Sequence, residues 1–381
     1  MPPGGHRAAF HYVHGRIAVL ALLICLLPFP AVATQSTSPA ARPGKLPAAD
    51  AAAIERRLTD AARRNPGSFD AQYALASFYL QQGRLDTAIV HLERAQAIDP
   101  SNYPSGYDLA LALIETGKVD RARAQISQML AAKETGELHN LLGDLEERTG
   151  NLVGAAEAYQ RAAHMDATEE HLFDWGNNLV TLKALEPAEK VFDAAVVRFP
   201  KSARLHVGRG IAQYARGRYE EAVRSFCTAS DLAPLDPRPH QFLGEIYGVA
   251  PKLGADVTRR LARFAKGQPR NALAQFHYAM SLWKGQPAGA PAPDLKQVES
   301  LLRRAVARDP TLADAFLQLG ILLSDQQRYP DAIEALRRAT RLQPTLAQAH
   351  YRLAQAYRRT GQQALAAKEL EIFEGLKSGS R

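Results

Sequence analysis

The chain has 381 residues, of which 46% are hydrophobic and 23% are charged, as in folded soluble proteins. Its formal net charge of +8 arises from 47 Lys and Arg residues against 39 Asp and Glu residues, and the two signs are interleaved along the sequence. Because the basic residues form no cluster, the charge favours a solvated surface and argues against a nucleic-acid partner.

The first 33 residues have the three parts of a secretory signal peptide. Two arginines precede an apolar run of eleven residues at 17–27, and two prolines and the small residues AVA follow it. This pattern predicts export to the periplasm or secretion, with residues 1–33 removed by a cut between Ala33 and Thr34. The apolar stretch is shorter than the ~20 residues of a membrane-spanning helix. Retention of residues 1–33 as a membrane anchor is the alternative.

The next segments predict a linker and then a helical domain. Residues 34–48 contain three prolines and a glycine among small polar residues, a composition typical of a flexible linker. From residue 49 onward the apolar residues recur with helical spacing, and no segment shows the convincing alternation of a strand. We therefore predict an all-α fold in which residues 49–68 form an N-terminal capping helix.

Prolines that end helices mark a repeat of 34 residues. They stand at positions 66 and 100, 200 and 234, and 310 and 344. In four units, small residues lie 24, 12 and 5 positions before the proline, and a large apolar residue lies eight before it. Antiparallel helices that cross at ~8–10 Å need small side chains at their closest approach. The large residue is predicted to fill the gap toward the next helix pair. Glycines are predicted to form the turns between paired helices, at Gly83, Gly117, Gly150, Gly217 and Gly361.

This pattern resembles the tetratricopeptide repeat family, whose 34-residue units each contain two helices. The segments at 73–100 and 317–344 are close to the family pattern. The resemblance implies a right-handed superhelical solenoid of about nine repeats over residues 69–380. The repeats are placed near 69–102, 103–135, 136–168, 169–202, 203–236, 237–271, 272–312, 313–346 and 347–380. Two depart from the pattern: 237–271 lacks a clear alanine in its second helix, and 272–312 contains an insertion at 285–293.

No pattern in the sequence predicts catalysis. The G-x-G at 208–210 follows no strand, and the sequence contains no C-x-x-C, H-E-x-x-H or G-x-S-x-G motif. The repeats also leave no room for a separate catalytic domain. We therefore expect no enzymatic activity, cofactor, metal or small-molecule substrate.

The resemblance implies that the first helix of each repeat lines a concave groove that holds a peptide or a partner protein. The Lys–Asn pair with which some members bind chaperone C-termini is absent from the corresponding positions, and so is an asparagine ladder. Acidic residues gather in the early repeats and basic residues in the late ones, and aromatic residues are typical interface anchors. Twelve residues are predicted to line the groove: Tyr73, Tyr107, Asp108, Asn140, Asp144, Phe173, Asn177, Tyr214, Phe276, Trp283, Tyr351 and Arg352. The alternative is that the aromatic residues pack between neighbouring helices.

The sequence therefore predicts an exported, non-enzymatic scaffold for protein–protein interaction. The alternative is a membrane-tethered assembly factor for a secretion, pilus or exopolysaccharide-export machine. In that case the chain would contact the membrane only through the retained residues 1–33.

The chain has two cysteines, and the predicted cleavage removes Cys25. Cys227 lies seven residues before Pro234, at an offset where other repeats carry a charged residue. We therefore expect Cys227 to be exposed on the convex side of the solenoid. Two interpretations remain open, an inert surface residue and a cysteine that forms a disulfide with a second chain.

Overall fold

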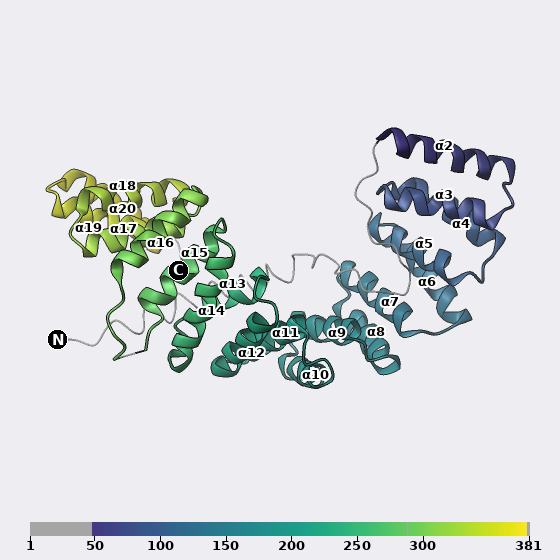
Figure 1. The fold of residues 1–381 in the computed structure, drawn as a ribbon, viewed down its shortest axis with the longest axis horizontal. Coiled ribbons are helices and arrows are strands. Elements are labelled where there is room, and N and C mark those ends of the chain that lie inside the picture. The colour runs from purple at the N-terminus through teal and green to yellow at the C-terminus, as the bar shows by residue number, and fades with distance from the viewer. Residues whose placement is uncertain (1–47, 288, 379–381) are drawn as a thin grey trace. The chain divides into compact units, whose positions relative to one another are not determined.

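The computed structural model describes residues 48–287 and 289–378. These residues form nineteen α-helices, α2–α20, and one short 3-10 helix, η1, with no strand among them (Figure 1). The prediction of an all-α fold is therefore confirmed. The predicted signal peptide and all but the last residue of the predicted linker lie outside the described residues.

Contacts divide the chain into two compact units, one ending at Pro200 and the other beginning at Lys201. In the N-terminal unit, α2 (Ala48–Arg64) packs through Ala51, Ile54 and Leu58 against the core of the first helix pairs. Four helix pairs follow α2. They are α3 (Phe69–Gln81) with α4 (Leu85–Ile98), α5 (Tyr103–Glu115) with α6 (Val119–Ala132), α7 (Gly136–Arg148) with α8 (Leu152–Met165), and α9 (Glu169–Thr181) with α10 (Leu185–Arg198).

The C-terminal unit contains five helix pairs, in which the two helices of each pair contact each other. They are α11 (Ala203–Ala215) with α12 (Tyr219–Leu232), α13 (Pro237–Glu245) with α14 (Gly254–Gly267), α15 (Ala272–Lys284) with α16 (Leu295–Arg308), α17 (Ala313–Asp325) with α18 (Tyr329–Leu342), and α19 (Ala347–Arg359) with α20 (Gln363–Ser378).

Local sequence explains where the helices begin and turn. The first helices of the four N-terminal pairs are each capped by a side-chain oxygen, from Ser68, Asn102, Thr135 and Thr168. All five predicted turn glycines have φ between 70° and 81°, a left-handed conformation that costs glycine little. Lys183 and Gln327 adopt the same conformation, at φ 60° and 61°, in the turns of α9–α10 and α17–α18.

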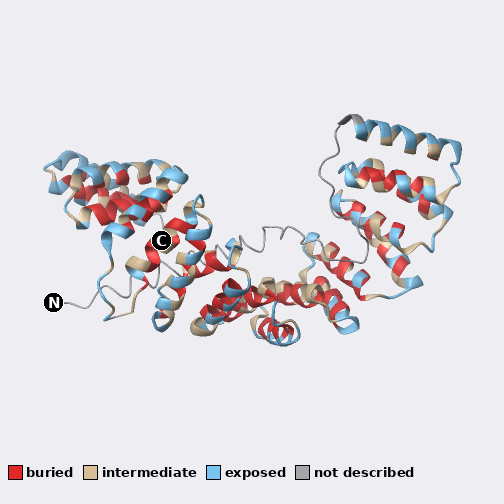
Figure 2. Ribbon diagram, in the orientation of Figure 1, coloured by how far each residue is buried: buried red, intermediate tan, exposed pale blue. Residues whose placement is uncertain are grey.

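The core of each regular pair lies where its two helices cross, and buried residues lie along the facing sides of the helices (Figure 2). In α9–α10, a Cβ atom on Gly176 would lie only 2.7 Å from the ring of Phe192. The large residue therefore fills the crossing within its own repeat, and not only the gap toward the next pair. The same contact recurs between Gly143 and Tyr159, Gly210 and Phe226, and Gly320 and Leu336.

Successive repeats are also joined by hydrogen bonds to the segments between them. Buried side chains near the start of a first helix donate to backbone carbonyls of the preceding segment. These bonds run from Gln72 Nε2 to the Pro66 oxygen (3.3 Å), from His171 Nδ1 to the Asp166 oxygen (2.7 Å) and from His350 Nε2 to the Pro344 oxygen (2.9 Å).

The pair α13–α14 is irregular. Helix α13 has only nine residues, and residues 246–253, which include η1 (Pro251–Leu253), separate it from α14. Val257 is 2% exposed and stands twelve residues before Pro269, where regular repeats have alanine. In the next pair, the insertion lies in the turn between α15 and α16, where Gln286 donates to the hydroxyl of Thr258 on α14 (3.3 Å).

Candidate protein-binding face

The first helices of the N-terminal unit are joined to one another by side-chain hydrogen bonds. Tyr73 on α3 donates through its hydroxyl to Asp108 Oδ2 on α5 (2.9 Å), and Asn140 Nδ2 on α7 donates to Asp174 Oδ2 on α9 (3.1 Å). Helix α7 also contacts both α5 and α9. Groove residues predicted from different repeats therefore lie on one surface. We call this surface the acidic face and define it by Tyr73, Tyr103, Tyr107, Asp108, Glu137, Asn140, Asp144, Glu147, Glu170 and Asp174.

On this face, helices α3 and α5 each begin with a pair of stacked aromatic rings. Phe69 stacks on Tyr73 with ring centroids 5.5 Å apart, and Tyr103 stacks on Tyr107 at 6.1 Å. The Tyr103 hydroxyl donates to Glu137 Oε2 on the next first helix (2.8 Å). The sequence prediction missed Phe69, Tyr103 and Glu137. Two aromatic pairs with a spacing of four residues, repeated 34 residues apart, were the signal that could have revealed Phe69 and Tyr103.

Carboxylates give the face its electrostatic character. Burial, and then the neighbouring Asp174, raise the pKa of Asp144 to about 7. The hydroxyl of Tyr159, a buried residue on α8, donates to Asp144 Oδ1 (2.7 Å) and Glu147 Oε2 (3.2 Å). Burial, followed by Glu137 and Asp144, raises the pKa of Tyr107 well above its ordinary value. The face therefore carries a concentrated negative charge beside half-buried tyrosine rings.

Phe173 does not belong to this face, and its prediction as a groove residue is wrong. Its side chain is 3% exposed and packs edge-on against Phe192, with centroids 6.1 Å apart. A phenylalanine has no polar atom to keep near water, so the ring turns into the core. Asn177, one turn further along α9, is half-buried.

In the C-terminal unit, the predicted groove residues each contact different neighbours. Tyr214 on α11 packs against Tyr219 of its own repeat at 5.1 Å, and its buried hydroxyl has no hydrogen-bond partner among the described residues. Phe276 lines a small pocket of about 100 Å³ together with Glu245 and Met280.

The basic side chain of Lys284 lies at the C-terminal end of α15. Lys284 lies 4.3 Å from the ring centroid of Trp283 and donates to Gln318 Oε1 on α17 (2.6 Å). Desolvation and nearby Arg352 lower the pKa of Lys284 to about 8. Tyr351, on the other hand, is 39% exposed and lies 5.2 Å from Phe373 on the final helix, so its ring leans toward α20.

Family models agree with the helix pairs. Models described as tetratricopeptide repeat match residues 49–103, 79–145 and 173–237, and a model described as TPR repeat matches 322–361. Together the matched segments cover just over half of the chain. The chain belongs to the tetratricopeptide repeat family. Proteins of this family are in general non-catalytic interaction scaffolds, because stacked repeats present extended surfaces.

Several known proteins are similar to this chain at low sequence identity. The C-terminal part of a TPR repeat-containing protein from Cytophaga hutchinsonii is 15% identical, with a TM-score of 0.51, over 64% of this chain and 97% of that chain. Yeast Tom70 is 15% identical, with a TM-score of 0.41, over 86% of this chain and 82% of that chain. The human protein O-mannosyl-transferase TMTC1 is 26% identical over 167 residues, which are 42% of this chain and 19% of that relative. The chain thus spans about a fifth of the length of this relative, and the likeness to the structure from Cytophaga hutchinsonii shows the fold alone.

Residues 48–287 and 289–378 contain neither a metal-binding cluster nor a membrane-spanning helix. Within these ranges, no group of three or more His, Cys, Asp and Glu residues could hold a metal ion. Likewise, none of the helices described there has the length and apolar character needed to cross a membrane.

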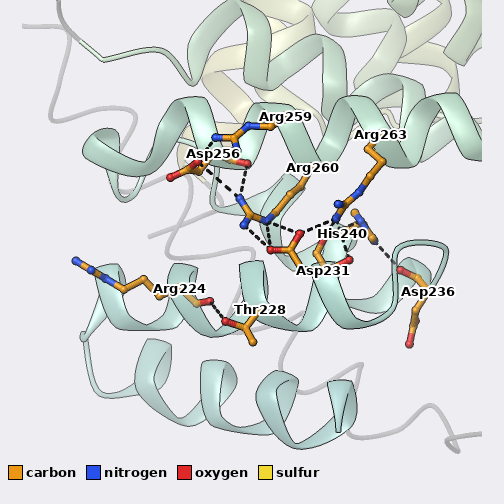
Figure 3. A network of polar contacts seen from close by, with 10 residues as sticks. Arg224, Thr228, Asp231, Asp236, His240, Asp256, Arg259, Arg260 and Arg263 are labelled. Atoms are coloured by element: carbon orange, nitrogen blue, oxygen red, sulfur yellow. Dashed lines mark hydrogen bonds and ion pairs between the residues drawn. The ribbon is translucent and has the colours of Figure 1, made fainter. Parts of the chain in front are cut away.

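Cys227 is buried, so the prediction that it faces solvent is wrong. It is 7% exposed, and burial raises the pKa of its thiol to about 11. In the irregular repeat, α14 lies against α12, and two of its arginines, Arg260 and Arg263, form ion pairs with Asp231 on α12 (Figure 3). Arg260 and Asp231 also act electrostatically on Cys227, so α14 lies near the position that is charged in regular repeats. A buried thiol of raised pKa is a poor nucleophile, which removes the basis for a disulfide between chains.

Proposed function

We propose that this tetratricopeptide repeat protein is a non-enzymatic scaffold that binds a polypeptide partner on the acidic face of its N-terminal unit. The observation that carries the proposal is the joining of first helices from successive repeats by Tyr73–Asp108 and Asn140–Asp174. A partner seated there would contact several repeats at once, with tyrosines as anchors.

A photo-crosslinking experiment in the native cells tests this proposal. Leu111 lies one turn after Tyr107 on α5 and is 41% exposed, whereas Val90 lies on the second helix α4 and is 45% exposed. A benzophenone amino acid at position 111 should crosslink to a discrete partner, and the same group at position 90 should not. Adding Tyr107→Ala to the position-111 variant should reduce crosslinking at least fivefold, with unchanged helical circular dichroism.

Equal crosslinking from positions 111 and 90, or crosslinking that Tyr107→Ala leaves intact, would show that the partner binds elsewhere. Because the two positions are similarly exposed and apolar, they differ mainly in the helix that carries them. The comparison therefore isolates the role of the first-helix surface.

We also propose that the protein works after export, in the periplasm or outside the cell. The apolar run at 17–27 and the small residues at 31–33 support this. Sequencing the N-terminus of the exported protein should give Thr34. A chain that is exported but still begins within residues 1–33 would favour the membrane-tethered assembly factor instead.

A further inference from the structure

We infer that the partner segment bound by the acidic face is basic, and that an arginine or lysine side chain is held between Asn140, Asp144 and Asp174. This inference rests on the proposed function and names the chemistry of its partner. Three independent features of this part of the face support it.

The first feature is an unsatisfied acceptor. Asn140 is 8% exposed, and its Nδ2 donates to the Asp174 carboxylate, which fixes the direction of the amide. Its buried Oδ1 has no hydrogen-bond partner among the described residues. Buried polar atoms are rarely left unpaired in native proteins. A guanidinium or ammonium group, which has only donors, could satisfy this oxygen.

The second feature is the charge around this amide. Asp144 and Asp174 are close enough for one to disfavour ionisation of the other, and Glu147 adds to the effect. Arg148 acts on Asp144 in the opposite direction, but its guanidinium is already paired with Glu115 (2.5 Å). A cation from a partner would stabilise the ionised Asp144 carboxylate, and arginine could donate to this carboxylate and the amide oxygen together.

The third feature is the neighbouring aromatic surface. Tyr107 interacts electrostatically with Glu137, Asp144 and Glu170, so these carboxylates lie in the neighbourhood of its hydroxyl, and Tyr103 stacks on its ring. Arginine and lysine side chains pack favourably on tyrosine rings through cation–π contacts and through their aliphatic parts. A bare metal ion would gain nothing from these rings, and no metal-binding cluster occurs among the residues that the structure describes.

The test compares two peptides that differ in charge but hardly in shape. A fluorescent peptide with four arginines spaced by Gly–Ser is titrated with the full chain, and so is its counterpart with citrulline in place of arginine. Anisotropy should show binding of the arginine peptide that weakens as salt rises, and at least tenfold weaker binding of the citrulline peptide. Equal binding of the two peptides would overturn the inference.

Matched variants then locate the binding. The double variant Asp144→Asn/Asp174→Asn should weaken binding of the arginine peptide at least tenfold. The control Asp120→Asn/Glu157→Gln likewise removes two carboxyl groups, from exposed positions on the second helices α6 and α8, and should change binding less than twofold. Similar losses in both double variants would mean a diffuse charge effect, and no loss in either would mean a different site. Each result contradicts the inference.

The proposed function and this inference can fail separately. If Tyr107→Ala abolishes crosslinking at position 111 while Asp144→Asn/Asp174→Asn leaves it unchanged, the face binds its partner without recognising a basic residue. That result overturns the inference alone. If neither substitution affects crosslinking, both proposals are wrong.

Discussion

Replacing Gly320 by alanine should destabilise the C-terminal unit by about 1–3 kcal/mol, the cost typical of overpacking a core. Alanine is the better helix former by about 1 kcal/mol, so helix propensity alone predicts the opposite sign. At this position a Cβ atom would lie 2.5 Å from Leu336 Cγ and 3.3 Å from the Ala332 carbonyl oxygen. The helices α17 and α18 would have to move apart to accommodate it. Urea unfolding followed by far-UV circular dichroism measures the effect.

Two companion variants sharpen this test. At Gly375, in α20 of the same unit, a Cβ atom would meet no other atom within 4 Å, so Gly375→Ala should stabilise by about 0.5–1 kcal/mol. Leu336→Ala should cost about 2–5 kcal/mol alone, and the double variant Gly320→Ala/Leu336→Ala should cost less than the sum of its parts. Additive losses would show that the steric contact does not determine the effect of Gly320→Ala.

Replacing Asp144 by asparagine should stabilise the N-terminal unit by about 1–2 kcal/mol above pH 7, with the two proteins converging near pH 4. In the folded state the pKa of Asp144 is raised to about 7 from an ordinary 3.8. The folded state therefore binds this proton more tightly than the unfolded state. Stability from protonation is fully present below 3.8 and is lost as the pH rises through about 7. Asparagine, which resembles the protonated carboxyl and can still accept from Tyr159, removes this loss.

Thermal unfolding at pH 4, 6 and 8 checks the expectation. Asp120→Asn removes an exposed carboxylate from α6 and should show no comparable dependence on pH. A lower melting temperature for Asp144→Asn at pH 8 would contradict the prediction. The expected gain in stability also means that weaker peptide binding by the single variant Asp144→Asn would not arise from unfolding. A site that costs stability is typical of binding surfaces.

The architecture could be predicted from sequence because it depends on local rules repeated many times. The turn glycines adopt positive φ, and small residues face large ones at the crossings of regular repeats, for example at Gly176 and Phe192. Each repeat confirms the spacing of the others. The family and the helical fold therefore followed from residues alone.

Side-chain direction in the candidate site was harder to predict. The fifth position of a first helix is shared by Tyr107, which stays half-buried at the surface, and by Phe173, which is buried. The pattern alone does not show whether a ring at the edge of the core turns outward or inward, and the hydroxyl that tyrosine has and phenylalanine lacks favours the outward direction. The hydrogen-bond partner of a tyrosine hydroxyl can come from the next repeat, as Glu137 does for Tyr103.

Cys227 was misplaced for a different reason. Its position was inferred from regular repeats, but the repeat that follows has a first helix of only nine residues. Helix α14 then pairs with α12 through Arg260 and Asp231. A periodic pattern describes an environment only while the neighbouring repeats keep the period.

The hydrogen bonds that tie each first helix to the preceding segment determine where this chain can change its length. Within each unit, three or four residues separate one repeat from the next, whereas the turns inside repeats reach eight residues at 246–253 and ten at 285–294. Extra residues between repeats would pull carbonyls such as that of Pro344 away from their buried donors. Extra residues inside a repeat leave these hydrogen bonds in place, and the insertion between α15 and α16 contacts α14 through Gln286 and is exposed at Pro291, Ala292 and Asp294. New elements, whether natural insertions or engineered reporters, therefore have room at the turn between α15 and α16 and little room at the junctions between repeats.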